Sequence, residues 1–294
     1  MKEDYRGFEL LIKFFQSQIY RSNVNQKINI NKHMRKFATI LLLNLGIIGA
    51  MTSVAWGQNA ATAPEELTEA IAGIEEAANN QDLDAVMEYY SENFETSEGL
   101  TVEMLSEALE QMWQNYPQLK YTTEIDSWSR SGQELIAETT TTVRGIQNTT
   151  GRQARLKSTI KSRQYFQGQK LVRQEILTEQ SELSSGQNPP QVVVSAPDSV
   201  KVGAKYNFDL IVDEPLGEQV LLGAVQEEKA AGSLYLNATP LELEPLPAGG
   251  IFKVATAPQV PESNLLSAIL VRGDGITMIT HRVNVEANET ASPE

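Results

Sequence analysis

Asp126 is the side chain whose type and position come nearest to those of a general base, and Tyr90 and Tyr121 are hydroxyls that could assist it. Proton-transfer sites of this kind use a buried carboxylate as the base and a tyrosine or second acid as a hydrogen-bond donor. Asp126, however, ends an alternating segment in which Tyr121 and Ile125 have the opposite parity. The alternation favours a surface carboxylate that faces bases on neighbouring strands, and catalysis by Asp126 is the alternative.

Other chemistries are limited by the residue types in the chain. There is no cysteine, which excludes thiol catalysis, disulfides and cysteine-ligated zinc. Only His281 follows residue 57, so a multi-histidine metal site is excluded there and a serine triad would depend on that one residue. Glu92, Glu95 and Glu98 could hold calcium, but without the aspartates of a calcium loop they are typical of an exposed acidic loop. We expect neither a metal nor a cofactor.

Aromatic and hydroxyl side chains are better candidates for a binding site. Aromatic side chains commonly line small-molecule pockets, although they more often fill a core. Two hydroxyl residues share the parity of the apolar strand positions and should face the same interior. The predicted pocket residues are Tyr90, Phe94, Trp113, Tyr116, Tyr121, Thr139 and Ser158. Packing of the aromatic members in a core is the alternative.

Three amphipathic helices precede any strand in the predicted order of elements. The first follows a capping-box pattern at Thr62–Glu65, and its apolar stripe covers residues 67–78. A shorter helix covers residues 83–90. The third begins at Thr101 and ends before Pro117, since proline cannot continue a helix.

The apolar period changes from that of a helix to two at Lys120, which is typical of a half-buried strand. Turn residues at 129–132 and 167–168 separate the runs that follow. The pattern predicts an antiparallel meander with strands at residues 120–126, 135–144, 154–166 and 171–177.

This order of elements resembles the nuclear transport factor 2-like superfamily over residues 64–180. The residues that carry the resemblance are Ala70–Phe94, Gly99-Leu100-Thr101, Tyr116-Pro117 and the sheet as far as Leu177. The resemblance implies an α+β fold in which helices lie on a curved antiparallel sheet and form a cone. Such proteins include isomerases, dehydratases, hydrolases and non-catalytic binding or assembly domains, so the resemblance selects no activity by itself.

Charge is segregated along this part of the chain. Residues 58–119 contain fourteen acids and no lysine or arginine, whereas residues 120–179 contain ten bases and six acids. We interpret this as a negative helical layer on a mildly positive sheet, with the two attracting each other inside one domain; a partner-binding field is the alternative. Because bases alternate with apolar residues at 152–163, a solvated sheet face is favoured over a nucleic-acid strip.

The second half is predicted to be an all-β sandwich at residues 191–287, after a linker at 181–190 and before a disordered tail at 288–294. Its entry at 196–203 resembles an immunoglobulin-like or fibronectin type III-like module in architecture only, since it has neither a cysteine pair nor a central tryptophan. The Arg-Gly-Asp triplet at 272–274 reads as a hairpin turn. The predicted strands are Val192–Ser195, Tyr206–Val212, Gln219–Val225, Leu234–Ala238, Ile251–Ala255, Leu265–Arg272 and Thr277–Val285.

The N-terminal segment has the pattern of an export signal. Residues 34–57 combine a basic start, an apolar run and a small-x-small site at Ala55-Trp56-Gly57, and residues 1–33 are typical of a disordered, over-called start. Cleavage after Gly57 would release a periplasmic or extracellular protein. An uncleaved anchor at 37–56 is the alternative and the only route to a membrane.

These observations predict an exported, non-catalytic protein whose cone holds a small apolar ligand or a protein partner, with the sandwich docking or spacing it. The part that follows residue 57 has 16 bases and 35 acids, a net charge of −19, which argues against nucleic acid and anionic lipid as partners. Two alternatives stay open. The first is an isomerase-, dehydratase- or hydrolase-type enzyme that uses the cone. The second is an envelope assembly factor that forms a homodimer through the outer face of the cone's sheet.

Overall fold

The structure is a computed structural model that describes residues 58–149, 152–214, 220–236, 241–246 and 249–288. The predictions for residues 1–57, including the anchor at 37–56, and for the tail at 289–294 concern residues outside this set. Within the described part of the chain, no helix is long and apolar enough to cross a membrane.

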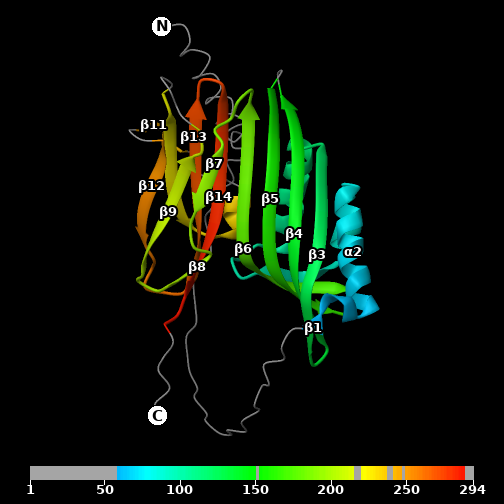
Figure 1. The fold of residues 1–294 in the computed structure, drawn as a ribbon. Coiled ribbons are helices and arrows are strands. Elements are labelled where there is room, and N and C mark those ends of the chain that lie inside the picture. The colour runs from blue at the N-terminus through cyan, green and yellow to red at the C-terminus, as the bar shows by residue number, and fades with distance from the viewer. Residues whose placement is uncertain (1–57, 150–151, 215–219, 237–240, 247–248, 289–294) are drawn as a thin grey trace, which may run out of the picture. The chain divides into compact units, whose positions relative to one another are not determined.

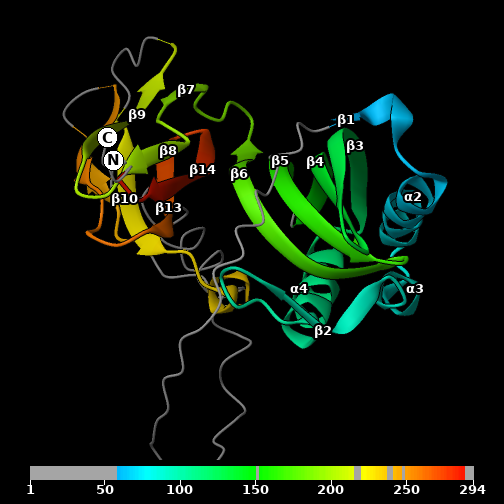
Figure 2. The ribbon, with the colours of Figure 1, turned by 90° about the horizontal axis from the view of Figure 1, so that it is seen from below.

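The helices form where the apolar stripes predict them: α2 (Glu65–Asn79), α3 (Leu83–Met87) and α4 (Val102–Asn115). The carboxylate of Asp82 accepts the N–H of Ala85 in the first turn of α3, and the hydroxyl of Thr101 accepts that of Met104 in the first turn of α4. Figure 2 shows all three on one side of the curved sheet built from β3 to β6.

The capping box predicted at Thr62 does not form. Pro64 precedes α2 and offers no side-chain cap. The Thr62 hydroxyl instead donates to the carbonyl of Asn59 and accepts the indole N–H of Trp128 at 3.2 Å. A tertiary contact with the sheet therefore competes successfully with the local cap.

The prediction that three helices precede any strand is wrong. β1 (Gln58–Asn59) comes before α2, and β2 (Tyr90–Thr96) lies between α3 and α4. β2 pairs in parallel with β6 through residues far along the chain, so the local sequence carries little sign of it. Its buried members are Phe94 and Thr96.

The meander is confirmed, with longer strands than predicted: β3 (Gln118–Ser131), β4 (Glu134–Thr149), β5 (Arg152–Gln167) and β6 (Lys170–Gly186). Side chains alternate as expected, so that Leu135, Ala137, Thr139 and Val143 are buried whereas Arg144 is exposed.

The linker predicted at 181–190 is wrong over its first part, because Ser181–Gly186 continues β6. This stretch pairs with β5 on one side and with β14 (Gly275–Glu286) on the other. Its serines and glutamate look like a linker by composition, but partners on both sides supply the ladder that composition cannot reveal. One sheet, in the order β1-β3-β4-β5-β6-β14-β13-β10-β11, therefore runs through both halves of the described chain (Figure 1).

The second half adds β13 (Glu262–Arg272), β10 (Leu222–Lys229), β11 (Glu244–Pro245) and β8 (Ser199–Lys201) to this sheet. A separate sheet contains β12 (Gly250–Thr256), β9 (Lys205–Val212) and β7 (Val192–Ser195). The two sheets share one apolar core, to which Phe208 and Leu210 contribute from β9 and Leu266 and Ile279 from β13 and β14.

One predicted strand of this half is wrong and another is displaced. Leu234 and Tyr235 lie in a 3-10 helix, η3 (Gly232–Tyr235), whose first residue is close to the backbone of Gly99 and Leu100, and residues 237–238 of the predicted strand are outside the described residues. The strand predicted at Gln219–Val225 begins at Leu222 and continues to Lys229. The described chain is thus mostly β, with its α-helices confined to the first half.

Candidate functional site

The polar side chains that face the helices inside the cone bond to one another. The Trp113 indole N–H donates to the Tyr121 hydroxyl at 3.1 Å. The Thr139 and Ser162 hydroxyls lie 3.1 Å apart, and those of Ser158 and Ser181 lie 2.7 Å apart. Pairing of this kind satisfies groups that burial would otherwise leave without partners.

The seven predicted pocket residues largely form the cone's core. Phe94 is 2% exposed and meets the edge of the Tyr90 ring at 4.8 Å between centroids. Trp113 belongs to a second buried cluster, against which Tyr116 and Tyr121 pack. The structure therefore brings most of these residues together in the interior, in the arrangement that the core alternative describes.

Burial raises the pKa of Tyr90, Tyr116 and Tyr121 in this group, and the shift is large for Tyr90. Burial, and to a smaller extent the nearby Tyr121 hydroxyl, raises the pKa of Tyr90 from 10.0 to about 12. Between these two values the unfolded chain binds fewer protons than the folded chain, so the free energy of unfolding falls as the pH rises.

We expect the wild type to lose roughly 2–3 kcal/mol more than Tyr90→Phe as the pH rises across the range 10 to 12. Urea unfolding of both proteins at a series of alkaline pH values measures this difference. Equal losses in the two proteins would show that Tyr90 ionises as freely in the folded chain as in the unfolded one.

Asp126 lies on the outer face of the sheet. Its carboxylate accepts the Thr140 hydroxyl at 2.8 Å and lies 3.6 Å from the Lys161 ammonium. The sheet has a bulge between Ile125 and Ser127, and after it the parity reverses so that Trp128 is buried. Asp126 therefore lies at the bulge itself, and its side chain points to the outer face of the sheet.

Among the described residues, no ion pair joins an acid of the helices to a base of the cone's sheet, as the predicted attraction between the two layers would require. Lys170 of β6 instead reaches the Glu88 carbonyl at the end of α3, and Arg163 lies 2.7 Å from Glu138 and 3.4 Å from Glu175 within the sheet. Strand parity contributes in β5, where Arg155, Lys157, Lys161 and Arg163 all occupy odd positions on the outer face.

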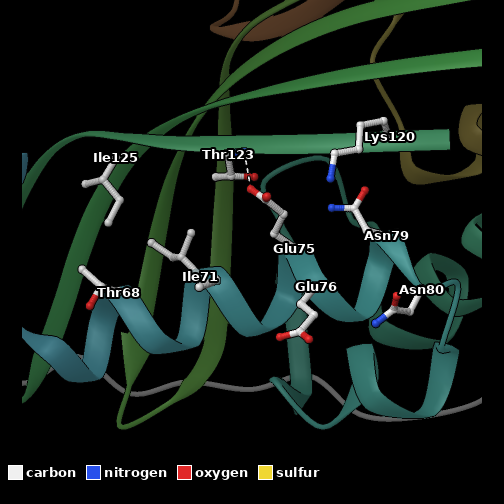
Figure 3. A pocket seen from close by; sticks show the side chains of 10 residues that line it. Thr68, Ile71, Glu75, Glu76, Asn79, Asn80, Lys120, Thr123 and Ile125 are labelled. Carbon is white, nitrogen blue, oxygen red and sulfur yellow. Dashed lines mark hydrogen bonds between the residues drawn. The ribbon is translucent and has the colours of Figure 1, made fainter.

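A groove lies at the edge of the cone, between α2 and β3. α2 runs along the free edge of β3 and supplies bonds that a neighbouring strand would give (Figure 3). The Asn79 amide accepts the N–H of Tyr121 at 2.8 Å and donates to its carbonyl at 3.0 Å. One turn earlier, the Glu75 carboxylate accepts the N–H of Thr123 at 2.6 Å.

The spacing of these bonds follows from two backbone periods. Four residues of a helix and two residues of a strand both advance by about 6–7 Å, so Glu75 and Asn79 reach alternate residues of β3. The arrangement covers an edge that would otherwise invite pairing with another chain. It also fixes α2 at a set distance from β3 and leaves a hollow beside it.

This α2–β3 groove has a volume of about 470 Å³. Ile71 and Ile125 give it an apolar floor, whereas Glu76, Asn80 and Lys120 add charge and amide groups at its mouth (Figure 3). Its full lining is Thr68, Ile71, Ala72, Glu75, Glu76, Asn79, Asn80, Lys120, Thr123 and Ile125. None of the seven predicted pocket residues is in this set. The sequence signal that could have found it is the Glu75–Asn79 pair, four positions apart beside an edge strand.

A smaller hollow of about 290 Å³ lies between β2 and α4 and includes Tyr90. Its mouth carries Glu92 and Glu103, and a hydrogen bond from the Thr101 hydroxyl is the main reason that the pKa of Glu103 is lowered. Within the described residues, no three histidine, cysteine or acidic side chains gather as a metal site.

Glu98 is not the exposed loop carboxylate that the sequence predicts. It accepts a bond from the Arg282 guanidinium at 2.9 Å, and its side chain is only 6% exposed. The same guanidinium donates to Glu179 at 3.0 Å and to the Tyr235 hydroxyl at 3.0 Å. We call these four residues the Arg282 cluster. Because it joins a turn of the cone to β6, β14 and η3, its role is structural.

Comparisons with known proteins cover the two halves separately. Residues 187–286 match a family described as a domain of unknown function, DUF8623, which is about a third of the chain. No curated protein matches the chain. These results assign no activity.

Solved structures resemble the first half at low similarity. One is Bdellovibrio bacteriovorus Bd1075, 16% identical over 37% of this chain and 38% of its own, with a TM-score of 0.28. A Catenulispora acidiphila hypothetical protein with a ketosteroid isomerase-like fold is 11% identical over 37% of this chain and 85% of its own, with a TM-score of 0.28. An epoxide hydrolase of Mycobacterium tuberculosis, described as LEH-like, is 15% identical over 38% and 83%, with a TM-score of 0.28.

The chain thus spans well under half of the Bd1075 structure and most of the other two. One of these structures is described as having a ketosteroid isomerase-like fold, and its similarity covers about 37% of this chain. The immunoglobulin-like architecture expected for the second half is not confirmed.

Proposed function

We propose that this chain is a non-catalytic binding protein whose ligand site is the α2–β3 groove. The observation that carries the proposal is the contrast between two surfaces. Inside the cone, the Trp113 indole bonds to the Tyr121 hydroxyl and the Thr139 hydroxyl bonds to that of Ser162, whereas the groove is a hollow lined by both apolar and polar side chains. A small-molecule site combines these features in a volume of a few hundred Å³.

The side chains that line the groove favour the binding of an amphipathic ligand. Ile71 and Ile125 would cover an apolar body, and Glu76 and Asn80 would bind a hydrogen-bond donor or a positive group at the mouth. Glu75 and Asn79 already bond to β3 and would serve to hold the wall in place. Asp126, the predicted candidate base, is on the outer face of the sheet and is not among the residues that line the groove.

The proposal also keeps the predicted export, which rests on residues 34–57 alone. In such a protein, the continuous sheet from β3 to β10 gives the groove a rigid support. The second half would then hold the site in place without contributing to it.

Native mass spectrometry of the chain purified from its own host tests this proposal. We expect a retained small molecule in the wild type and at least a tenfold loss of occupancy in Ala72→Trp, because an indole at this exposed lining position fills the groove. Gln114→Trp adds the same side chain at an exposed position of α4 and should retain the ligand. A bare wild-type protein, or equal retention in both variants, would contradict the assignment.

A further inference from the structure

Exposed apolar side chains of the second half gather on one face. Val193, Ile211, Phe252 and Val254 are 52%, 43%, 60% and 72% exposed. All four lie on the outer face of the three-stranded sheet β7–β9–β12, because their neighbours along each strand point into the core. We call this surface the β9 face.

Strand register makes the β9 face continuous. Val193 lies opposite Ile211, and Ile211 lies opposite Gly250, two residues before Phe252. Side chains at such direct and diagonal positions are within reach of one another. Clustered apolar groups of this kind mark an interaction surface more often than isolated ones do.

The polar residues of the β9 face indicate which partner fits. Between the apolar positions, β9 presents Lys205, Asn207 and Asp209, each opposite a residue of β12. In the described part of the chain neither Lys205 nor Asp209 belongs to an ion pair. Four residues of strand separate them by about 13 Å, too far for them to pair with each other.

The order Lys205, Asn207, Asp209 is complementary to the same three residues of a second copy whose strand runs in the opposite direction. A two-fold axis through Asn207 places Lys205 of one copy opposite Asp209 of the other, and does so twice. Val254, which lies beside Asn207, then meets the same residue of the second copy. We propose that the β9 face packs against the β9 face of a second copy and forms a two-fold symmetric dimer.

Other surfaces and occupants fit less well. The outer face of the cone's sheet, where a homodimer is predicted from the sequence, carries charges that already pair within one copy, such as Arg163 with Glu138 and Glu175, so it offers no apolar contact of the kind that the β9 face does. A lipid surface would remove the Asp209 carboxylate from water without giving it a partner, which costs desolvation free energy. In the dimer, Lys205 of the second copy pairs with this carboxylate and offsets that cost.

Sedimentation velocity of the full chain, over concentrations up to about 100 μM, tests the dimer. We expect a concentration-dependent dimer in the wild type and at least a tenfold weaker association in Phe252→Glu. Val260→Glu changes a similarly exposed valine in the loop between β12 and β13, outside the three strands of the face, and should leave the dimer intact. Association weakened as much by Val260→Glu would overturn the assignment to this face.

A charge-reversal experiment distinguishes this specific interface from nonspecific association. Lys205→Asp and Asp209→Lys should each weaken the dimer, since each places like charges opposite each other, and the double variant should restore it. A wild type that stays monomeric, or a double variant no better than the single ones, would overturn the proposal. So would a monomer that binds phosphatidylcholine vesicles through Phe252.

Discussion

Arg282→Met is expected to lower the free energy of unfolding by about 3–5 kcal/mol. The Arg282 side chain is fully buried, and it is the cation that Glu98 and Glu179 face at 2.9 and 3.0 Å. Burial disfavours its charge, but the Tyr235 hydroxyl and the two carboxylates outweigh that cost and raise the pKa of Arg282. Methionine would fill much of the space and leave two buried carboxylates without a cation.

Urea unfolding followed by circular dichroism measures the loss. Arg130→Met is the control, because Arg130 is exposed and its replacement should change stability by no more than about 0.5 kcal/mol. Adding Glu98→Gln and Glu179→Gln to Arg282→Met should recover part of the loss, since the unpaired charges are then removed. A cost below about 1 kcal/mol for Arg282→Met would mean that water reaches the carboxylates in the folded chain.

The elements that the sequence predicts well are those whose pattern is local. The stripe of α2 and the alternation of β4 both follow from one buried face, and both are found where predicted. The outward direction of Asp126 is another such result, although the bulge beside it reverses the parity of the next residues. Turn residues likewise locate the hairpin at 272–274, where Arg272 is buried and bonds to the Asn188 carbonyl.

The features that the sequence does not predict depend on pairing between segments that are distant in the chain. Ser181–Gly186 is polar and short of apolar residues, yet β5 and β14 on its two sides make it a strand. Arg282 and Glu98 are 184 positions apart, and no local pattern joins them. Composition describes a segment by itself, whereas the ladder and the ion pair each need a partner.

The candidate site also has some features that the sequence predicts and others that it misses. Trp113 and Tyr121 are predicted to share an interior, and the structure joins them by a hydrogen bond. The groove was missed because α2 lines it with residues from its polar side, which apolar periodicity treats as solvent-facing. An amide and a carboxylate bonded to a strand edge can be recognised only when the edge is known.

The two halves meet at the end of β6, and Gly186 is the residue on which that junction depends. Its φ of +109° is in the region that favours glycine, and it pairs with Gly275 at the start of β14. The carbonyl of Asp274 accepts the N–H groups of Gln187 and Asn188 at 2.9 and 3.2 Å. A Cβ at Gly186 would lie 2.4 Å from that carbonyl oxygen and 2.7 Å from the Gly275 Cα.

Gly186→Ala should therefore lower the free energy of unfolding by about 3 kcal/mol or more, since backbone strain and a clash with fixed backbone atoms add together. Gly132→Ala is the matched control: its φ is +60°, nothing lies within 4 Å of the added Cβ, and only about 1–2 kcal/mol of strain is expected. Calorimetry measures both. If one sheet couples the halves, Gly186→Ala should also divide a single unfolding transition into two. Equal costs at the two glycines, with one transition in each protein, would mean that the junction yields to the methyl group and that the halves are held together by the Arg282 cluster.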